Sequence, residues 1–225
     1  MEITKPQLTK NIATNFNLCT TQSAWSERFP IFQSHIDLAQ SYWSKLVKSG
    51  DIVIDATCGN GHDTLLLARL ALTADSGYLY GFDIQKEAID STRENLQSQL
   101  SLPLLERVFL HQRSHSNLVD ALPSGCRPKL IVYNLGYLPG GDKAMTTMLD
   151  TTLQSIQQAQ ALIANGGAIS ITCYPGHLEG LQEESALMEI VCQLPAATWS
   201  CCHHRWLNRK NAPSLLLIQK SLKAE

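Results

Sequence analysis

The chain has 225 residues, and 44% of them are hydrophobic, so it can bury one substantial core. Its formal net charge of −2 argues against a general binder of polyanions. No apolar run approaches the roughly eighteen residues that a membrane-spanning helix needs, and the N-terminus lacks the features of a secretory signal. We therefore expect the protein in a bacterial-type cytoplasm or in an organelle of a eukaryote.

The chain begins with a segment that shows no clear periodicity. We expect residues 1–30 to form an arm outside a single domain that spans residues 31–225. An amphipathic helix is predicted at residues 34–48. A short apolar strand follows it and ends on Asp55.

A glycine turn connects this strand with the next helix. The turn runs through Gly59 and Gly61, and the helix opens at Asp63 and Thr64. Because glycine has no Cβ, the backbone N–H groups of such a turn can come close to a ligand. The segment therefore predicts a binding loop at the end of the first strand.

The second strand, predicted at residues 78–83, ends in another carboxylate. Asp83 could accept hydrogen bonds from both hydroxyls of a ribose, which indicates a nucleoside-type cofactor at the carboxyl edge of a parallel sheet. A dinucleotide fingerprint would have a small residue where Thr64 stands, and Asp55 would repel a pyrophosphate. The two acids with the glycine pair resemble S-adenosylmethionine-dependent methyltransferases of the Rossmann-like class. The alternative, a turn without a ligand, does not explain why both strands end in Asp.

The rest of the chain alternates between strands and helices. Helices are predicted at residues 64–72, 85–100, 146–164 and 180–192, and strands at residues 108–111, 129–133, 168–173, 197–203 and 214–220. This alternation is typical of an α/β protein with a doubly wound sheet. We predict a Rossmann-like class I methyltransferase fold: a seven-stranded, mostly parallel sheet with an antiparallel C-terminal edge hairpin and helices on both faces.

A second motif follows the predicted fourth strand. Asn134 offers an amide that can accept a hydrogen bond from an amine, Tyr137 offers a face for stacking a base, and Asp142 could bind the amine or take its proton. Asn-Leu-Gly-Tyr is similar to the Asn-Pro-Pro-Tyr loop of methyltransferases that modify exocyclic amines of nucleobases, although both prolines differ. Alternatively, the glycines and proline of this segment build a rigid turn, and Asp142 bonds to the amides beyond Gly141.

The polar segment 205–213 joins the last two predicted strands. Cations around a tryptophan could bind a phosphate backbone and an unstacked base. The candidate RNA contacts are Arg205, Trp206, Arg209, Lys210 and Asn211, with His177 as a further candidate. The alternative is a solvated hairpin turn.

Residues 201–204, Cys-Cys-His-His, look like a metal cluster at first sight. Neighbouring residues of a strand point to opposite faces, so at most one Cys and one His of this run could share a site. We expect no metal. The seven cysteines include no Cys-x-x-Cys pair and are expected to be free thiols in a reducing compartment.

Two motifs carry a resemblance to a known family. Residues 55–64 read Asp-Ala-Thr-Cys-Gly-Asn-Gly-His-Asp-Thr, and residues 134–143 read Asn-Leu-Gly-Tyr-Leu-Pro-Gly-Gly-Asp-Lys. Further matches are residues 115–117, 174–177 and 211–213. Over residues 35–220 the chain closely resembles a bacterial and organellar family once labelled ribosomal RNA methylases and now understood as the tRNA wobble-uridine 5-aminomethyl methyltransferase. It departs in its longer N-terminal arm and in a single proline near Asn211.

The resemblance implies methylation of the 5-aminomethyl amine of the wobble (2-thio)uridine, which gives the 5-methylaminomethyl form. The implied cofactor is S-adenosyl-L-methionine and the implied partner is a tRNA anticodon stem-loop, with no DNA or membrane partner and with a monomer or homodimer as the active form. A ribosomal RNA methyltransferase and a small-molecule N-methyltransferase are the alternatives. A non-enzymatic RNA-binding module would have no need for both carboxylates and the acceptor loop.

The resemblance also assigns residues. Those implied to cradle the methionine moiety are Asp55, Thr57, Gly59, Asn60, Gly61, Asp63 and Thr64. Those implied for the nucleoside are Asp83 at the ribose, Ile84 and Gln85 against the adenine, and His115 and Asn117 at the adenine amine. His115 has a plainer alternative, a loop histidine bonded to backbone. Asn134 would align the acceptor amine, Tyr137 would stack the uracil, and Asp142 would bind or deprotonate the aminomethyl group.

Overall fold

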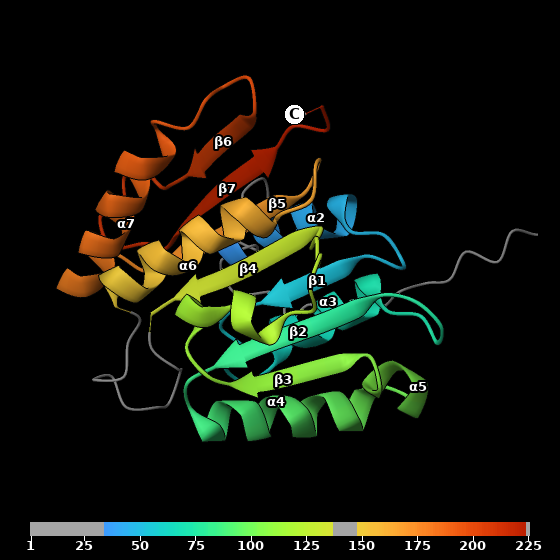
Figure 1. The fold of residues 1–225 in the computed structure, drawn as a ribbon. Coiled ribbons are helices and arrows are strands. Elements are labelled where there is room, and N and C mark those ends of the chain that lie inside the picture. Colours follow the sequence, from blue (N-terminus) through green and yellow to red (C-terminus); the bar gives the residue numbers. More distant parts are fainter. Residues whose placement is uncertain (1–33, 137–147, 224–225) are drawn as a thin grey trace, which may run out of the picture. The chain divides into compact units, whose positions relative to one another are not determined.

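In this computed structural model, the structure describes residues 34–136 and 148–223. The strands are β1 (Ile52–Asp55), β2 (Tyr78–Asp83), β3 (Val108–Gln112), β4 (Leu130–Leu135), β5 (Ala168–Cys173), β6 (Trp199–His204) and β7 (Ser214–Lys220). They form one seven-stranded sheet in the order β3-β2-β1-β4-β5-β7-β6 (Figure 1). The first five strands pair in parallel, and β7 runs antiparallel to both β5 and β6. This confirms the predicted sheet and its edge hairpin.

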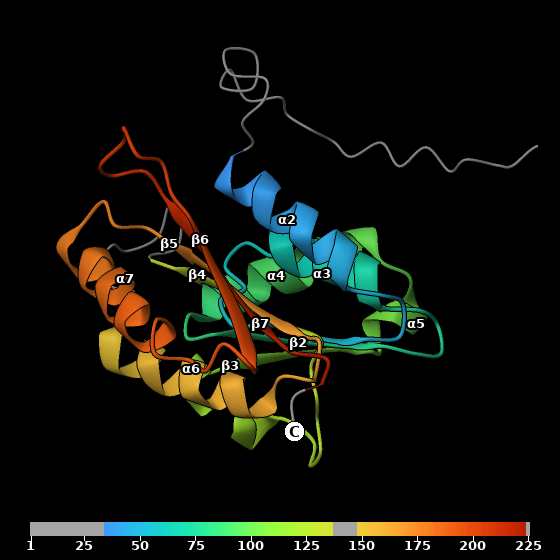
Figure 2. The ribbon, with the colours of Figure 1, turned by 90° about the horizontal axis from the view of Figure 1, so that it is seen from above.

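Helices cover both faces of the sheet. On one face lie α2 (His35–Leu46), α3 (His62–Ala71) and α4 (Lys86–Gln99), and on the other lie α6 (Leu149–Leu162) and α7 (Leu178–Val191), as the view along the sheet shows (Figure 2). Three short helices were not predicted: α5 (Leu102–Leu105), η1 (His115–Asn117) and η2 (Val119–Ala121). Each is too short to show a helical period in the sequence.

Two apolar layers flank the central strands. All six residues of β5 are buried, as expected for a parallel strand that is covered on both faces. Trp43 on α2 is fully buried on one side, and its Nε1–H donates to Ser170 Oγ over 2.9 Å. Tyr133 on β4 is fully buried on the other side, with its Oη 2.8 Å from Ser155 Oγ. Both large aromatic residues thus bury their polar atoms with a partner.

The structure shifts two of the predicted boundaries that matter for function. Strand β4 was predicted to end at Tyr133, but it continues to Leu135, and Asn134 pairs with Thr172 of β5. Asn134 is therefore fixed by the sheet and is not part of a loop. Helix α3 begins at His62, because Gly61 caps it with a φ of 77°. The predicted arm, residues 1–30, lies outside the described residues.

The order of the strands determines where a ligand can bind. The connection after β1 leads to β2 on one side, and the connection after β3 crosses back to β4 on the other side of β1. The strand order therefore reverses between β1 and β4, and in open α/β sheets ligands bind beyond the carboxyl ends of the strands at such a point. Asp55, Asp83 and Asn134 all stand at those ends.

In the part of the chain that the structure describes, we find no helix with the length and apolar character needed to traverse a bilayer.

Candidate active site

The glycine loop (residues 56–61) connects β1 to α3 and is held by backbone contacts. The Cys58 N–H donates to the carbonyl of Phe82 over 2.9 Å, and Thr92 Oγ1 donates to the carbonyl of Gly59 over 3.1 Å. A Cβ added to Gly61 would lie 2.8 Å from the Cα of Thr92. Glycine is thus required at this position both for the left-handed φ and for the close approach of α4.

Asp55 fastens the glycine loop to α3 from within the protein. Its carboxyl accepts the Thr64 hydroxyl over 2.6 Å and the Thr57 N–H over 3.1 Å, and both Asp55 and Thr64 are 0% exposed. Burial raises the pKa of Asp55 to about 7, with smaller contributions from the charges of Asp63 and Asp83. These contacts shape the loop, and the predicted place of Asp55 and Thr64 among the residues that cradle the methionine moiety stays a prediction.

Asp83 ties the glycine loop to the end of β2. One of its oxygens accepts the Gly59 N–H and the other accepts the Gln85 N–H, each over 3.0 Å. The carboxylate is only half-buried, and each oxygen keeps a lone pair for another donor. Ile84 beside it is 47% exposed. A carboxylate with an apolar neighbour at this edge suits a ribose and its base.

Asn134 is joined to the glycine loop and to α3. Its N–H donates to Thr57 Oγ1 over 2.7 Å, and its side-chain Nδ2 donates to Asp63 Oδ2 over 3.0 Å. The other Asp63 oxygen accepts Gln40 Nε2 over 2.9 Å. We call Gln40, Asp63 and Asn134 the amide–carboxylate cluster. It brings together three elements that are far apart in the sequence.

Two further residues surround this cluster. His35 Nε2 and Tyr174 Oη lie 3.4 Å apart, with the rings edge to face. Burial lowers the pKa of His35 and raises the pKa of Tyr174 to about 12, so both are neutral at pH 7. The Tyr174 ring also lies against Gly136, where an added Cβ would be 3.6 Å from its Cδ2.

Sequence analysis did not place Gln40, His35 or Tyr174 in the site. The position of Tyr174 directly after β5 was a usable signal, because polar residues at the carboxyl ends of parallel strands gather at one edge. Gln40 and His35 lie on α2, before the first strand, where no comparable signal exists.

His115 is buried beside β4. Its ring meets Tyr133 edge to face with centroids 5.8 Å apart, and its Nδ1 has no hydrogen-bond partner among the described residues. Burial lowers the pKa of His115 to about 4, so the ring is neutral. The alternative of a histidine bonded to backbone through Nδ1 is thus not seen. Asn117 nearby is exposed.

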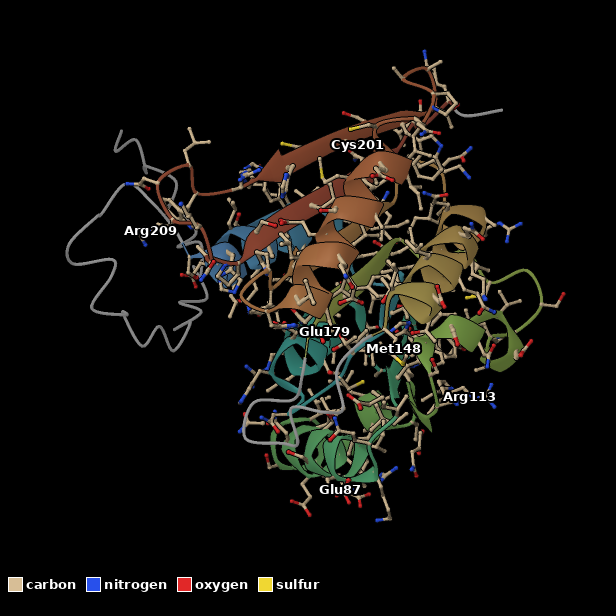
Figure 3. All side chains as sticks on the ribbon, turned by 90° about the vertical axis from the view of Figure 1, so that its left-hand side faces the viewer. Glu87, Arg113, Met148, Glu179, Cys201 and Arg209 are labelled. Atoms are coloured by element: carbon tan, nitrogen blue, oxygen red, sulfur yellow. The ribbon has the colours of Figure 1, made fainter. Side chains whose placement is uncertain are left out.

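The hairpin loop (residues 205–213) connects β6 to β7. Arg209 lies over the Trp206 ring at 5.0 Å from its centroid, and Figure 3 shows Arg209 on this loop, beyond the end of the hairpin. A Cβ added to Gly176 would be 3.8 Å from the carbonyl of Asn211, so the segment after β5 lies beside the hairpin loop. His177 in that segment caps α7 by accepting the Gly180 N–H over 3.1 Å.

Strand β6 directs its two histidines to opposite faces. His203 lies 3.2 Å from Glu184 of α7, and His204 lies 3.1 Å from Tyr42 of α2. Within residues 34–136 and 148–223, no group of three or more His, Cys, Asp or Glu side chains could hold a metal ion. The six cysteines in those ranges are free thiols. Two predicted catalytic residues, Tyr137 and Asp142, lie outside the described residues.

Comparisons with known proteins give consistent matches. The model of the family described as "Putative rRNA methylase" matches residues 79–220. The "tRNA (mnm(5)s(2)U34)-methyltransferase, chloroplastic" of Arabidopsis thaliana is 38% identical over 187 residues, which are 82% of this chain and 68% of that protein.

Solved structures agree. An rRNA-methylase structure from Clostridium thermocellum has a TM-score of 0.77 and 34% identity, and the match covers 84% of this chain and 98% of that one. A Streptococcus mutans methyltransferase structure in complex with SAH has a TM-score of 0.72 and 28% identity, with 84% and 99% covered. The fold is thus that of class I methyltransferases, and the chain belongs to the family that its matching model describes as rRNA methylases.

Proposed function

We propose that this protein is an S-adenosylmethionine-dependent tRNA methyltransferase. Its acceptor would be the 5-aminomethyl amine of the wobble (2-thio)uridine, and its product the 5-methylaminomethyl nucleoside. The Arabidopsis relative, at 38% identity, supports the tRNA substrate. The observation that carries an amine acceptor is the Asn134 side chain, held at the end of β4 with its amide nitrogen already bonded to Asp63.

The residues at the carboxyl ends of β1 and β2 fit S-adenosylmethionine. When bound, this cofactor supplies an electrophilic methyl group on a sulfonium. Gly59 and Gly61 offer backbone without side chains, which suits the methionine moiety, and Asn60 lies between them in the same loop. Asp83 would accept from the ribose hydroxyls, with Ile84 and Gln85 beside the adenine.

Two further residues complete the proposed adenine site. The exposed Asn117 could bond the adenine amine, and His115, whose Nδ1 is buried without a partner among the described residues, would line the site beside it. Asp55 and Thr64 would contribute by holding the glycine loop in shape. A cofactor-bound relative in Streptococcus mutans, whose complex contains SAH, supports this assignment.

An amine can accept a methyl group only while its nitrogen lone pair is free. The Oδ1 of Asn134 can accept one amine N–H and so direct the lone pair toward the methyl group. Alignment of this kind is worth several kcal/mol of activation free energy, up to about 7–11 kcal/mol in the best cases. An aliphatic ammonium has no lone pair, so the substrate amine must lose a proton before it attacks, and the methylated product is then a secondary ammonium. Asp142 as the group that takes the substrate's proton and Tyr137 as the stacking platform stay predictions.

The hairpin loop is the proposed RNA surface. Arg205, Lys210 and Asn211 are exposed, and the Arg209–Trp206 stack combines a cation with an aromatic face. His177 stands beside this loop at the start of α7. A small anticodon stem-loop suits a protein with a net charge of −2 better than an extended duplex does. The chloroplastic relative is compatible with action in an organelle as well as in a bacterial cytoplasm.

A ribosomal RNA methyltransferase is the second candidate, and the description of the family model favours it. One experiment separates the tRNA and the ribosomal RNA assignments. The protein is incubated with labelled S-adenosylmethionine and either total tRNA from cells lacking the gene or ribosomal RNA, and the RNA is then digested for nucleoside mass analysis. We expect label on 5-aminomethyl-2-thiouridine. Label found only in ribosomal RNA would overturn the tRNA assignment and keep the cofactor.

A further inference from the structure

We propose that Asp63 is a positioning residue: it locks the Asn134 amide in the orientation that presents Oδ1 to the acceptor amine. This inference rests on the proposed function, because it takes the acceptor to be an amine. It assigns Asp63 a role different from a direct cofactor ligand. The relevant groups are the amide–carboxylate cluster defined above.

The contacts around Asp63 are specific. Its Oδ2 accepts Asn134 Nδ2 over 3.0 Å and its Oδ1 accepts Gln40 Nε2 over 2.9 Å, so each carboxylate oxygen holds one side-chain amide. All three side chains are half-buried. Asp63 stands in the first turn of α3, where the free N–H groups of the helix favour a negative charge.

The chemistry of the donors fixes the direction of the Asn134 amide. An ionised carboxylate has only acceptor atoms, whereas a side-chain amide has two donors on nitrogen and an acceptor on oxygen. Facing Asp63, Asn134 must therefore turn its NH₂ inward and its Oδ1 away. The backbone N–H of the same residue is held by Thr57 Oγ1 over 2.7 Å, so the whole residue is anchored from two sides.

This orientation favours transfer to nitrogen. With Asn134 Oδ1 facing the acceptor, the amine donates an N–H to it and keeps its lone pair free. If the Asn134 amide were turned over, its NH₂ would donate to the nitrogen lone pair that must attack the methyl group. As the methyl group is transferred, positive charge builds up on the amine nitrogen. When the NH₂ of a side-chain amide donates to a carboxylate, the oxygen of the same amide becomes a stronger hydrogen-bond acceptor. Asn134 Oδ1 therefore stabilises the growing positive charge more in the transition state than in the bound substrate.

The Asp63→Asn variant tests this assignment. The substituted amide can present either its oxygen or its nitrogen to Asn134, so the acceptor amide is free to turn over. We expect kcat on 5-aminomethyl tRNA to fall about 10- to 100-fold, less than the roughly 100- to 1,000-fold for loss of a preorganised group at the reacting atoms, because Asp63 acts through Asn134. The Kd values for S-adenosylmethionine and tRNA should change less than about 3-fold, since no binding contact is lost. Asp90→Asn, a surface carboxylate paired with Lys86 and Arg93 on α4, is the matched control and should keep wild-type kcat.

An exchange of the two side chains gives a readout that a merely structural role would not move. Asn134→Asp alone sets two carboxylates against each other and should be the least active variant. In the double variant Asp63→Asn with Asn134→Asp, the amide introduced on α3 can accept from Gln40 and donate to the carboxylate introduced on β4, which leaves one oxygen for the amine. We expect kcat to recover at least about 5-fold over Asn134→Asp.

Each outcome decides between the explanations. If Asp63→Asn raises the Kd for S-adenosylmethionine as much as it lowers kcat, Asp63 is a cofactor ligand and the inference is wrong. If the exchange gives no recovery while each variant melts near the wild-type temperature, the inference is also wrong. A wild-type enzyme without turnover on 5-aminomethyl tRNA would refute the proposed function and this inference together, whereas normal turnover by Asp63→Asn would refute the inference alone.

Discussion

The glycine loop and the hairpin loop lie at the same sheet but are built in different ways. In the glycine loop, Asp55 is fully buried, Asp83 accepts two backbone N–H groups, and Gly61 leaves no space for a Cβ. In the hairpin loop, Leu207 is 93% exposed, and the stack of Arg209 on Trp206 is its clearest side-chain contact.

The difference indicates which parts of the function come from the fold and which from individual side chains. A loop whose polar groups are tied to buried backbone has one conformation before any ligand arrives, which lowers the entropy that binding must overcome. An exposed loop of cations and an aromatic residue contributes through contacts with its partner. We therefore expect substitutions in the glycine loop to affect folding and cofactor binding, and substitutions in the hairpin loop to affect RNA binding.

The largest effect is expected at Gly61. Gly61→Ala combines a φ of 77° with a Cβ placed 2.8 Å from the Thr92 backbone, and should reduce the free energy of unfolding by about 3 kcal/mol. Gly125 has the same φ of 77°, but an added Cβ there meets nothing within 4 Å. Gly125→Ala should therefore lose only about 1 kcal/mol, the effect of φ alone. Urea unfolding measures both, and equal losses would show that the contact with α4 does not matter.

Next comes the affinity for the cofactor. Asp83→Ala removes the acceptor proposed for the ribose hydroxyls and frees the Gly59 and Gln85 N–H groups, so the Kd for S-adenosylmethionine should rise about 100-fold. Isothermal titration gives this value directly. Ala in place of the exposed Asp120 of η2 is the control and should bind as the wild type does. A shift below about 3-fold at Asp83 would contradict the ribose assignment.

A pH effect of intermediate size should come from Asp55. Its pKa of about 7 in the folded state lies above the ordinary value of 3.8, so between about pH 4 and pH 7 the folded state binds more protons than the unfolded one. The stability that Asp55 contributes is therefore lost as the pH rises through this window. Asn in its place does not titrate: its Oδ1 can still accept the Thr57 N–H, while its Nδ2 would donate to the Thr64 hydroxyl. Relative to wild type, Asp55→Asn should gain about 3 kcal/mol of stability from pH 4 to pH 7, because each pKa unit of the shift corresponds to about 1.4 kcal/mol.

Urea unfolding of both proteins at matched pH values checks this expectation. The comparison removes contributions that the two chains share, such as His115, whose lowered pKa acts in the opposite direction and adds stability as the pH rises between about 4 and 6.5. A difference that stays constant with pH would mean that Asp55 is ionised in the folded protein throughout.

The smallest effect is expected in the hairpin loop. Arg209→Ala removes one cation of the proposed RNA surface and its stack on Trp206, so the Kd for tRNA should rise about 3- to 10-fold and the salt dependence should weaken by about one phosphate. Binding of S-adenosylmethionine should not change. Arg107 is a matched control, because it also stacks on an aromatic residue, Tyr78, at the opposite part of the sheet. An equal loss for Arg107→Ala would show a general charge effect.

Sequence patterns that act over short distances predicted the fold and the positions of several candidate site residues at the ends of its strands. The strand ending on Asp55, the glycine turn and the strand ending on Asp83 lie within about 30 residues, where local turn chemistry and the rules of parallel sheets apply. The edge hairpin followed from two neighbouring strands without a helix between them. These features require no knowledge of distant contacts.

The amide–carboxylate cluster could not be predicted in the same way. Asp63 and Asn134 are 71 positions apart, and Gln40 lies 23 positions before Asp63 on a helix whose docking depends on the packed core. The end of β4 was placed too early, because Asn134 is a poor strand former whose conformation is set by pairing with β5. Tertiary contacts, which no local sequence pattern encodes, determine both the formation of the amide–carboxylate cluster and the end of β4.

The most direct test of the central claim uses two anticodon stem-loops that differ only at the wobble position, one with 5-aminomethyl-2-thiouridine and one with 2-thiouridine. The measurement is the mass of the wobble nucleoside after incubation with the protein and S-adenosylmethionine. The account predicts the gain of one methyl group on the aminomethyl RNA and no change in the other. Methylation of both RNAs, or of neither while the protein binds the cofactor, would contradict it.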